Sequence, residues 1–218
     1  SGKLLWSVKT FAADDPLYIS GAPRVFGGKV LIGNAGTIGA ARGFVTAYDA
    51  ATGKQLWTAK PAGPLRGSPT VAFNAVYVMT VDNRIHALNS ADGKPLWNES
   101  GSSGQTGVFG VAAPAAGSGT VIAGYSTGEI AAYRYENGRT LWSDALARTS
   151  ISTQVGVLTD VDADPIIDAG RVYALGQGGR MAAYELVSGQ RIWELNLGGI
   201  FTPAVSGDWI FTLTDDAR

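Results

Sequence analysis

The fold is decided by the stretch Ala47-Tyr48-Asp49-Ala50-Ala51-Thr52-Gly53-Lys54-Gln55-Leu56-Trp57, because its pattern returns along the chain. In this pattern an alanine lies six residues before a glycine, and a tryptophan lies four residues after that glycine. Three further copies follow, and the first residues of the chain preserve the end of another. The repeat tryptophans, spaced 40 to 51 residues apart, are Trp6, Trp57, Trp97, Trp142 and Trp193. The sequence is therefore an array of similar units.

Two further runs with strand character precede the alanine of each copy. In the second copy they are residues 68–72 and 75–79, and in the fourth they are residues 165–167 and 171–175. Each repeat therefore predicts four short antiparallel strands, with the alanine in the third and the tryptophan in the fourth. Four strands at this period are typical of a β-propeller blade. We predict an all-β propeller with four complete four-stranded blades and partial strands at both ends.

Composition supports this fold class and excludes several kinds of function. Glycine accounts for 30 of 218 residues and only 16% of residues are charged, as expected for short strands joined by tight turns. The formal net charge of −1 gives no basic surface for nucleic acid. The lack of cysteine excludes disulfides, thiolate catalysis and cysteine-based metal sites. No apolar run is long enough for a membrane-spanning helix, and no leader or lipid anchor is visible.

From about residue 62 to residue 218, the loops as well as the blade framework resemble the BamB family. BamB proteins are propeller lipoproteins of the outer-membrane β-barrel assembly machinery. The segments that carry the resemblance are residues 67–71, 80–83, 125–129, 137–144 and 160–165. The resemblance implies a non-enzymatic, protein-binding scaffold in the periplasm, at the inner side of the outer membrane, whose partner is BamA.

The same resemblance implies which residues contact BamA. It maps acidic contact residues onto Asp160 and Asp162, and a second contact loop onto the residues around Val108 and Phe109. The family pattern has a leucine and an arginine in that second loop, so the chain departs from it at both positions. The resemblance therefore supports the apolar part of that contact and not its cationic part.

Residues 1 to about 58 resemble instead a blade of the quinoprotein alcohol dehydrogenases, which use pyrroloquinoline quinone (PQQ). The matching segments are residues 20–25, 29–34 and 42–49. In that family a loop of this blade supplies an acidic ligand to a calcium ion beside the quinone. Here that position falls on Ile38, which has no oxygen for a hard cation, and Ser20 is the one hydroxyl residue that matches. We therefore expect no cofactor.

The remaining candidate residues indicate neither catalysis nor metal binding. His86 is the only histidine, and a single histidine cannot build a histidine-rich metal site. Asp160, Asp162 and Asp164 alternate like the start of a calcium loop. However, Pro165 and Arg171 stand where an EF-hand requires glycine and glutamate. Trp209 lies outside the repeat pattern. It begins an expected strand over residues 209–213, and we expect its side chain to lie in the protein core.

Three interpretations stay open. The first is a scaffold of the BamB type, with residues 1–218 forming one PQQ-like propeller. The second is a fragment of a PQQ-dependent alcohol dehydrogenase with a degraded cofactor site. The third is an engineered or recombined propeller without its own activity, since two family resemblances meet near residue 60. The ring is expected to be partial or chimeric. Two alternatives stay open: the chain is part of a larger ring, or self-association with a second chain completes the ring.

Overall fold

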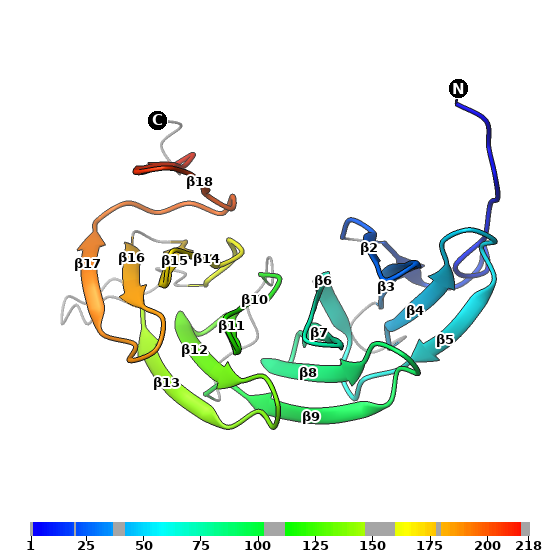
Figure 1. The fold of residues 1–218 in the computed structure, drawn as a ribbon, viewed down its shortest axis with the longest axis horizontal. Coiled ribbons are helices and arrows are strands. Elements are labelled where there is room, and N and C mark those ends of the chain that lie inside the picture. The colour runs from blue at the N-terminus through cyan, green and yellow to red at the C-terminus, as the bar shows by residue number, and fades with distance from the viewer. Residues whose placement is uncertain are drawn as a thin grey trace. The chain divides into compact units, whose positions relative to one another are not determined.

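A computed structural model describes residues 2–19, 21–36, 42–102, 112–146, 160–177 and 180–214 (Figure 1). All the regular secondary structure assigned within these ranges consists of β-strands. The chain forms two compact units, Ser1–Asn98 and Glu99–Arg218.

The first unit contains two antiparallel sheets. The strands of its first sheet are β1 (Leu17–Tyr18), β2 (Arg24–Phe26), β3 (Lys29–Gly36), β4 (Phe44–Asp49) and β5 (Gln55–Ala59). Both β1 and β2 pair with β3, which is followed by β4 and β5 in order. The strands of the second sheet, in order, are β6 (Leu65–Ala72), β7 (Ala75–Thr80), β8 (Arg84–Asn89) and β9 (Pro95–Ser100). Each repeat in this unit therefore forms one sheet, and the first sheet carries the additional strand β1.

The second unit contains two four-stranded antiparallel sheets and a hairpin. The first sheet contains β10 (Ala115–Gly117), β11 (Thr120–Gly124), β12 (Glu129–Arg134) and β13 (Thr140–Ala145). The second contains β14 (Ile166–Asp168), β15 (Arg171–Gly176), β16 (Arg180–Glu185) and β17 (Arg191–Leu195). The hairpin contains β18 (Ala204–Ser206) and β19 (Trp209–Phe211). The four predicted blades are confirmed, and the partial strands predicted near the C-terminus form this hairpin.

The turn glycine of each repeat has the same geometry in all four complete copies. Gly53, Gly93, Gly138 and Gly189 have φ angles of +70° to +74°. The amide of each donates a hydrogen bond of 2.8 to 2.9 Å to the carbonyl four residues earlier, at Asp49, Asn89, Arg134 and Glu185. A positive φ strains any residue with a side chain, so this turn requires glycine.

Within each unit the repeat tryptophan lies against the turn glycine of the following repeat. A Cβ atom added to Gly53 would lie 2.6 Å from the ring of Trp6, and one added to Gly93 would lie 2.6 Å from Trp57. Gly189 meets Trp142 in the same way. Each indole also donates a hydrogen bond to the carbonyl three residues before its glycine, at Ala50 (3.0 Å), Ser90 (3.2 Å) and Leu186 (2.9 Å). We call this pair of contacts the Trp–Gly joint.

Trp209 was expected in the core. In the structure it is 71% exposed. Among the described residues, β19 pairs only with β18, in a register that places Trp209 opposite Ser206 beside the hairpin turn. In the preceding blade this position is held by Arg171, which is also exposed. The expectation was wrong because an apolar strand is buried only where further elements cover it.

Candidate functional site

Backbone hydrogen bonds hold the acidic segment of residues 160–165 in place. The amide of Val161 donates to the carbonyl of Tyr125 at 3.1 Å, and the amide of Gln177 donates to the carbonyl of Asp160 at 2.8 Å. Val161 and Ala163 are almost completely buried. The segment is therefore fixed between the ends of β11 and β15, and its side chains have defined positions.

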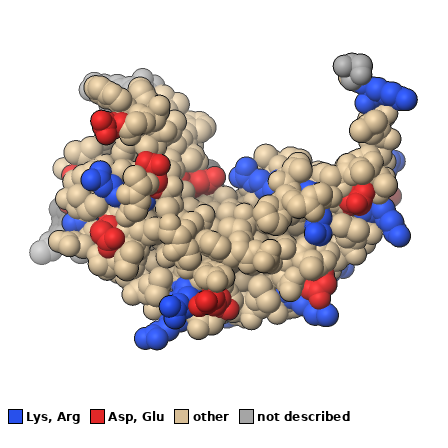
Figure 2. Space-filling model, viewed as in Figure 1, with Lys and Arg blue, Asp and Glu red and all other residues tan. Residues whose placement is uncertain are grey.

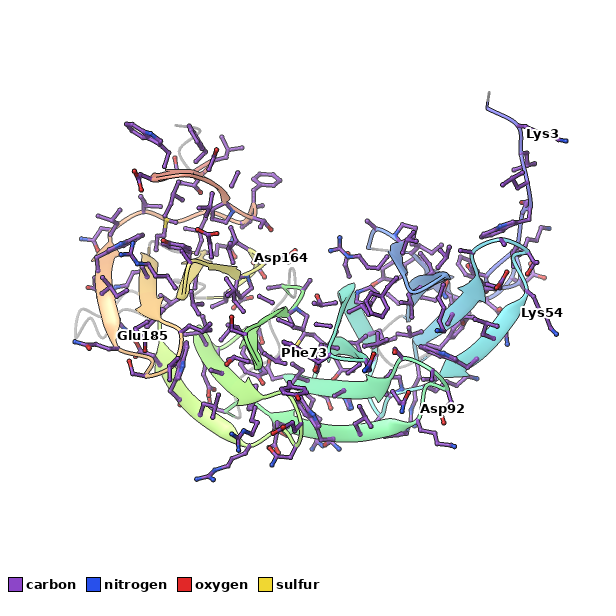
Figure 3. All side chains as sticks on the ribbon, in the orientation of Figure 1. Lys3, Lys54, Phe73, Asp92, Asp164 and Glu185 are labelled. Carbon is purple, nitrogen blue, oxygen red and sulfur yellow. The ribbon has the colours of Figure 1, made fainter. Side chains whose placement is uncertain are left out.

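The three carboxylates of this segment differ in accessibility and in role. Asp160 is only 3% exposed, whereas Asp162 and Asp164 are half-buried. The carboxylate of Asp164 (Figure 3) accepts a hydrogen bond from the amide of Ala113 at 2.7 Å. The amide of Asp164 donates to the hydroxyl of Thr202 at 3.2 Å. Asp164 therefore connects two other loops to the start of β14. Asp162 is less buried as a residue than Asp160, but both of its carboxylate oxygens are buried.

Four other residues singled out by the sequence lie outside the described residues. These are Val108 and Phe109 of the second predicted contact loop, and Ile38 and Ser20 of the quinone-like blade. In the part of the chain that the structure describes, no three histidine, aspartate or glutamate side chains lie together as a metal site would require.

His86 lies in β8 and is 8% exposed. Its Nε2 atom is 3.3 Å from Oγ1 of Thr80, and the Thr80 hydroxyl donates to the carbonyl of Arg84, also at 3.3 Å. Because the hydroxyl proton is used in that bond, Oγ1 accepts from Nε2–H, and Nδ1 of the neutral ring is left as an acceptor. Burial lowers the pKa of His86, and Arg84 lowers it further, while the Asp82 carboxylate opposes both effects.

The stability of the fold is expected to fall as the pH drops below the ordinary histidine pKa of 6.5. In the window between that value and the lowered pKa of folded His86, the unfolded chain binds a proton that the folded chain does not. Urea unfolding at a series of pH values measures the effect. The control is His86→Ala, since Ala131 and Ala182 hold this position in other copies. Equal slopes of stability against pH in both proteins would contradict the prediction.

A charged network in the second unit was missed by the sequence analysis. Nε of Arg191 donates to Asp144 at 3.0 Å, and the same guanidinium pairs with Glu194. The guanidinium also lies 5.7 Å from the ring centroid of Tyr184, which in turn stacks on Trp142 with centroids 5.5 Å apart. The sequence did contain a signal for this network, because its residues stand at fixed offsets from the repeat glycine and tryptophans. The signal is visible only when the residues at these offsets are compared between copies.

Charges are otherwise dispersed. Figure 2 shows acidic and basic side chains interspersed over a mostly uncharged face. The described residues contain no helix with the length and apolar character needed to cross a membrane.

Comparison with known proteins gives a consistent family. The family model described as outer membrane protein assembly factor BamB matches residues 1–218. Outer membrane protein assembly factor BamB of Escherichia coli (strain K12) is 30% identical over 222 residues, covering all of this chain and 55% of that protein. The chain therefore spans about half the length of the curated relatives it matches.

Solved structures show the same fold. The crystal structure of BamB from Moraxella catarrhalis matches with a TM-score of 0.77 and 23% identity, covering 92% of this chain and 59% of that one. Quinohemoprotein alcohol dehydrogenase from Comamonas testosteroni matches with a TM-score of 0.67 and 20% identity, covering 85% of this chain and 36% of that one. The fold is that of PQQ-like propeller blades. Since the family model spans the first repeat as well as the later ones, the chain belongs to the family of outer membrane protein assembly factor BamB.

Proposed function

We propose that this chain is a non-enzymatic scaffold of the BamB type, which acts in the assembly of outer-membrane β-barrel proteins from the periplasmic side of that membrane. The observation that carries the proposal is the family match over the whole chain. The likeness to alcohol dehydrogenases concerns the fold, and at the position of their calcium ligand this sequence has Ile38. Catalysis is therefore not part of the proposal.

The proposed partner is BamA, and the proposed contacts are Asp160, Asp162, Val108 and Phe109. The hydrogen bond from the Ala113 amide to Asp164 supports a single contact surface, because it ties the acidic segment to residues close after Phe109. Asp162 is the less buried residue of the two, and we expect its carboxylate, whose oxygens are buried in the chain alone, to turn toward the partner on binding. The buried Asp160 is expected to maintain the shape of the segment.

Binding to the periplasmic domains of BamA is expected to weaken at least tenfold in Asp162→Ala. A carboxylate in the centre of an interface contributes on the order of 2 kcal/mol. Calorimetric titration measures the affinity. Asp168→Ala is the matched control, because Asp168 is an exposed aspartate outside the segment and its removal changes the net charge equally. Thermal unfolding of Asp160→Ala separates a loss of shape from a loss of contact. If the wild-type protein had no affinity for BamA, or if Asp162→Ala and Asp168→Ala bound equally well, this docking site would be refuted.

We also propose that residues 1–218 form one array of PQQ-like blades and not two unrelated domains. Two observations support this: the family model crosses residue 60, and the Trp–Gly joint has the same geometry in both units. Self-association remains a prediction, and the mass of the protein in solution tests it.

A further inference from the structure

Equivalent grooves beside two of the joints are filled differently. In the second unit, four charged side chains of β13, β16 and β17 form one network of ion pairs. Arg191 pairs with Asp144 and with Glu194, and Arg180 lies 3.3 Å from Glu194. The side chains of Arg180 and Arg191 are only 21% and 28% exposed. Two carboxylates of the chain itself therefore neutralise two arginines in this groove.

In the first unit only one of these four charges is retained. Counting from the repeat glycine and tryptophans, Ala59 replaces Asp144, Pro95 replaces Arg191 and Asn98 replaces Glu194. Arg84 stands at the position of Arg180. Both carboxylates are thus missing while the arginine of the third strand remains.

These replacements coincide with an open cavity of about 560 Å³. One wall is the end of β5 with the residues after it, and the other is formed by β8, β9 and the turn between them, which carries Asp92 (Figure 3). The volume lies within the range of about 300–1,000 Å³ found for small-molecule sites. The groove can therefore accept a ligand group in the space that the second unit fills with its own side chains.

The charged groups along the cavity are three cations and one carboxylate, that of Asp92. Arg84, Lys60 and Lys94 line it, and Lys94 is neutralised by Asp92 at 2.9 Å. Arg84 lies 3.4 Å from Asp82, with both side chains nearly half exposed, so this ion pair is weak. His86 also lines the cavity, and the ring is anchored through Nε2. The excess positive charge favours an anionic ligand.

We propose that the groove between β5 and β8–β9 binds a carboxylate, which pairs with Arg84 as Glu194 pairs with Arg180 in the second unit. The ligand is a small organic acid or the acidic side chain of a peptide. Arginine forms stronger and more directional hydrogen bonds with carboxylates than neutral donors do. The site is separate from the acidic segment, so its function is additional to the proposed scaffold role.

The test is titration of the wild-type chain with succinate and with N-acetylglutamate N-methylamide, followed by NMR of the His86 ring. A weak but saturable site is expected, with a Kd on the order of 1 mM. Sodium chloride at equal ionic strength controls for screening. Arg84→Gln is expected to weaken binding by about tenfold or more. Arg139→Gln, which removes an exposed arginine far along the sequence, is expected to leave binding unchanged. The tighter of the two probes identifies the source of the carboxylate.

A second variant supplies the carboxylate from the chain itself. Asn98→Glu places a carboxylate where Glu194 stands in the other unit, so it is expected to pair with Arg84 and abolish binding while the protein remains folded. Circular dichroism and thermal unfolding confirm the folded state. Absence of saturation for both probes at about 50 mM would overturn the proposal. Equal binding by the wild type and Arg84→Gln, or by the wild type and a folded Asn98→Glu, would also overturn it.

Discussion

Gly189→Ala is expected to lower the free energy of unfolding by about 3 kcal/mol or more. Two costs add up at this position. The residue has a φ angle of +71°, which strains any side chain, and the new Cβ atom would overlap the indole of Trp142. The indole cannot retreat without losing its hydrogen bond to the carbonyl of Leu186, at 2.9 Å. Urea unfolding measures the loss.

Gly170→Ala is the control that separates the two costs. Gly170 has nearly the same φ angle, +75°, but an added Cβ would meet no atom within 4 Å. Only the backbone strain remains, so the expected loss is about 1 to 2 kcal/mol. The difference between the two variants measures the clash with the indole. If both variants lost the same stability, the Trp–Gly joint would not be a close contact in solution.

Trp142→Ala is expected to destabilise the protein by about 3 to 5 kcal/mol, the usual cost of removing a large buried aromatic side chain. Trp142 is 9% exposed and is one of the buried residues that form the core of the second unit. Its removal leaves a cavity, deprives the Leu186 carbonyl of a donor and removes the ring on which Tyr184 stacks. For a chain of this length the midpoint of thermal unfolding should fall by roughly 10 °C.

Trp209→Ala is the matched control, since it deletes the same side chain from a site that is 71% exposed. Its expected cost is below about 1 kcal/mol. Trp142→Phe should fall between the two, because phenylalanine retains an apolar ring and lacks the indole N–H. A loss in Trp209→Ala as large as that in Trp142→Ala would show that the exposed hairpin is packed in solution.

The sequence predicted those features that every copy repeats. The alanine, glycine and tryptophan offsets located the strands and turns, because each offset satisfies a local requirement. Ala47 and Ala183, for example, are completely buried in their strands, and the glycines adopt a positive φ. Repetition makes such requirements visible in a single sequence.

Features that depend on distant neighbours could not be predicted. The burial of Asp160 follows from two backbone hydrogen bonds, from Val161 to Tyr125 and from Gln177 to Asp160, which no local pattern indicates. The exposure of Trp209 depends on which elements cover β19. The open groove depends on which charges one copy lacks relative to another, and this comparison requires knowing that the side chains meet in space.

The Trp–Gly joint has a consequence for how such chains evolve. Every complete copy has the glycine turn and the tryptophan, and in the joints within each unit the glycine receives the indole of the preceding copy. A tandem duplication of one copy would therefore create a new neighbour that is complementary from the outset, without compensating mutations. Gain or loss of a whole copy is then easier than gain or loss of a single strand. Related proteins can therefore differ in length by complete repeats.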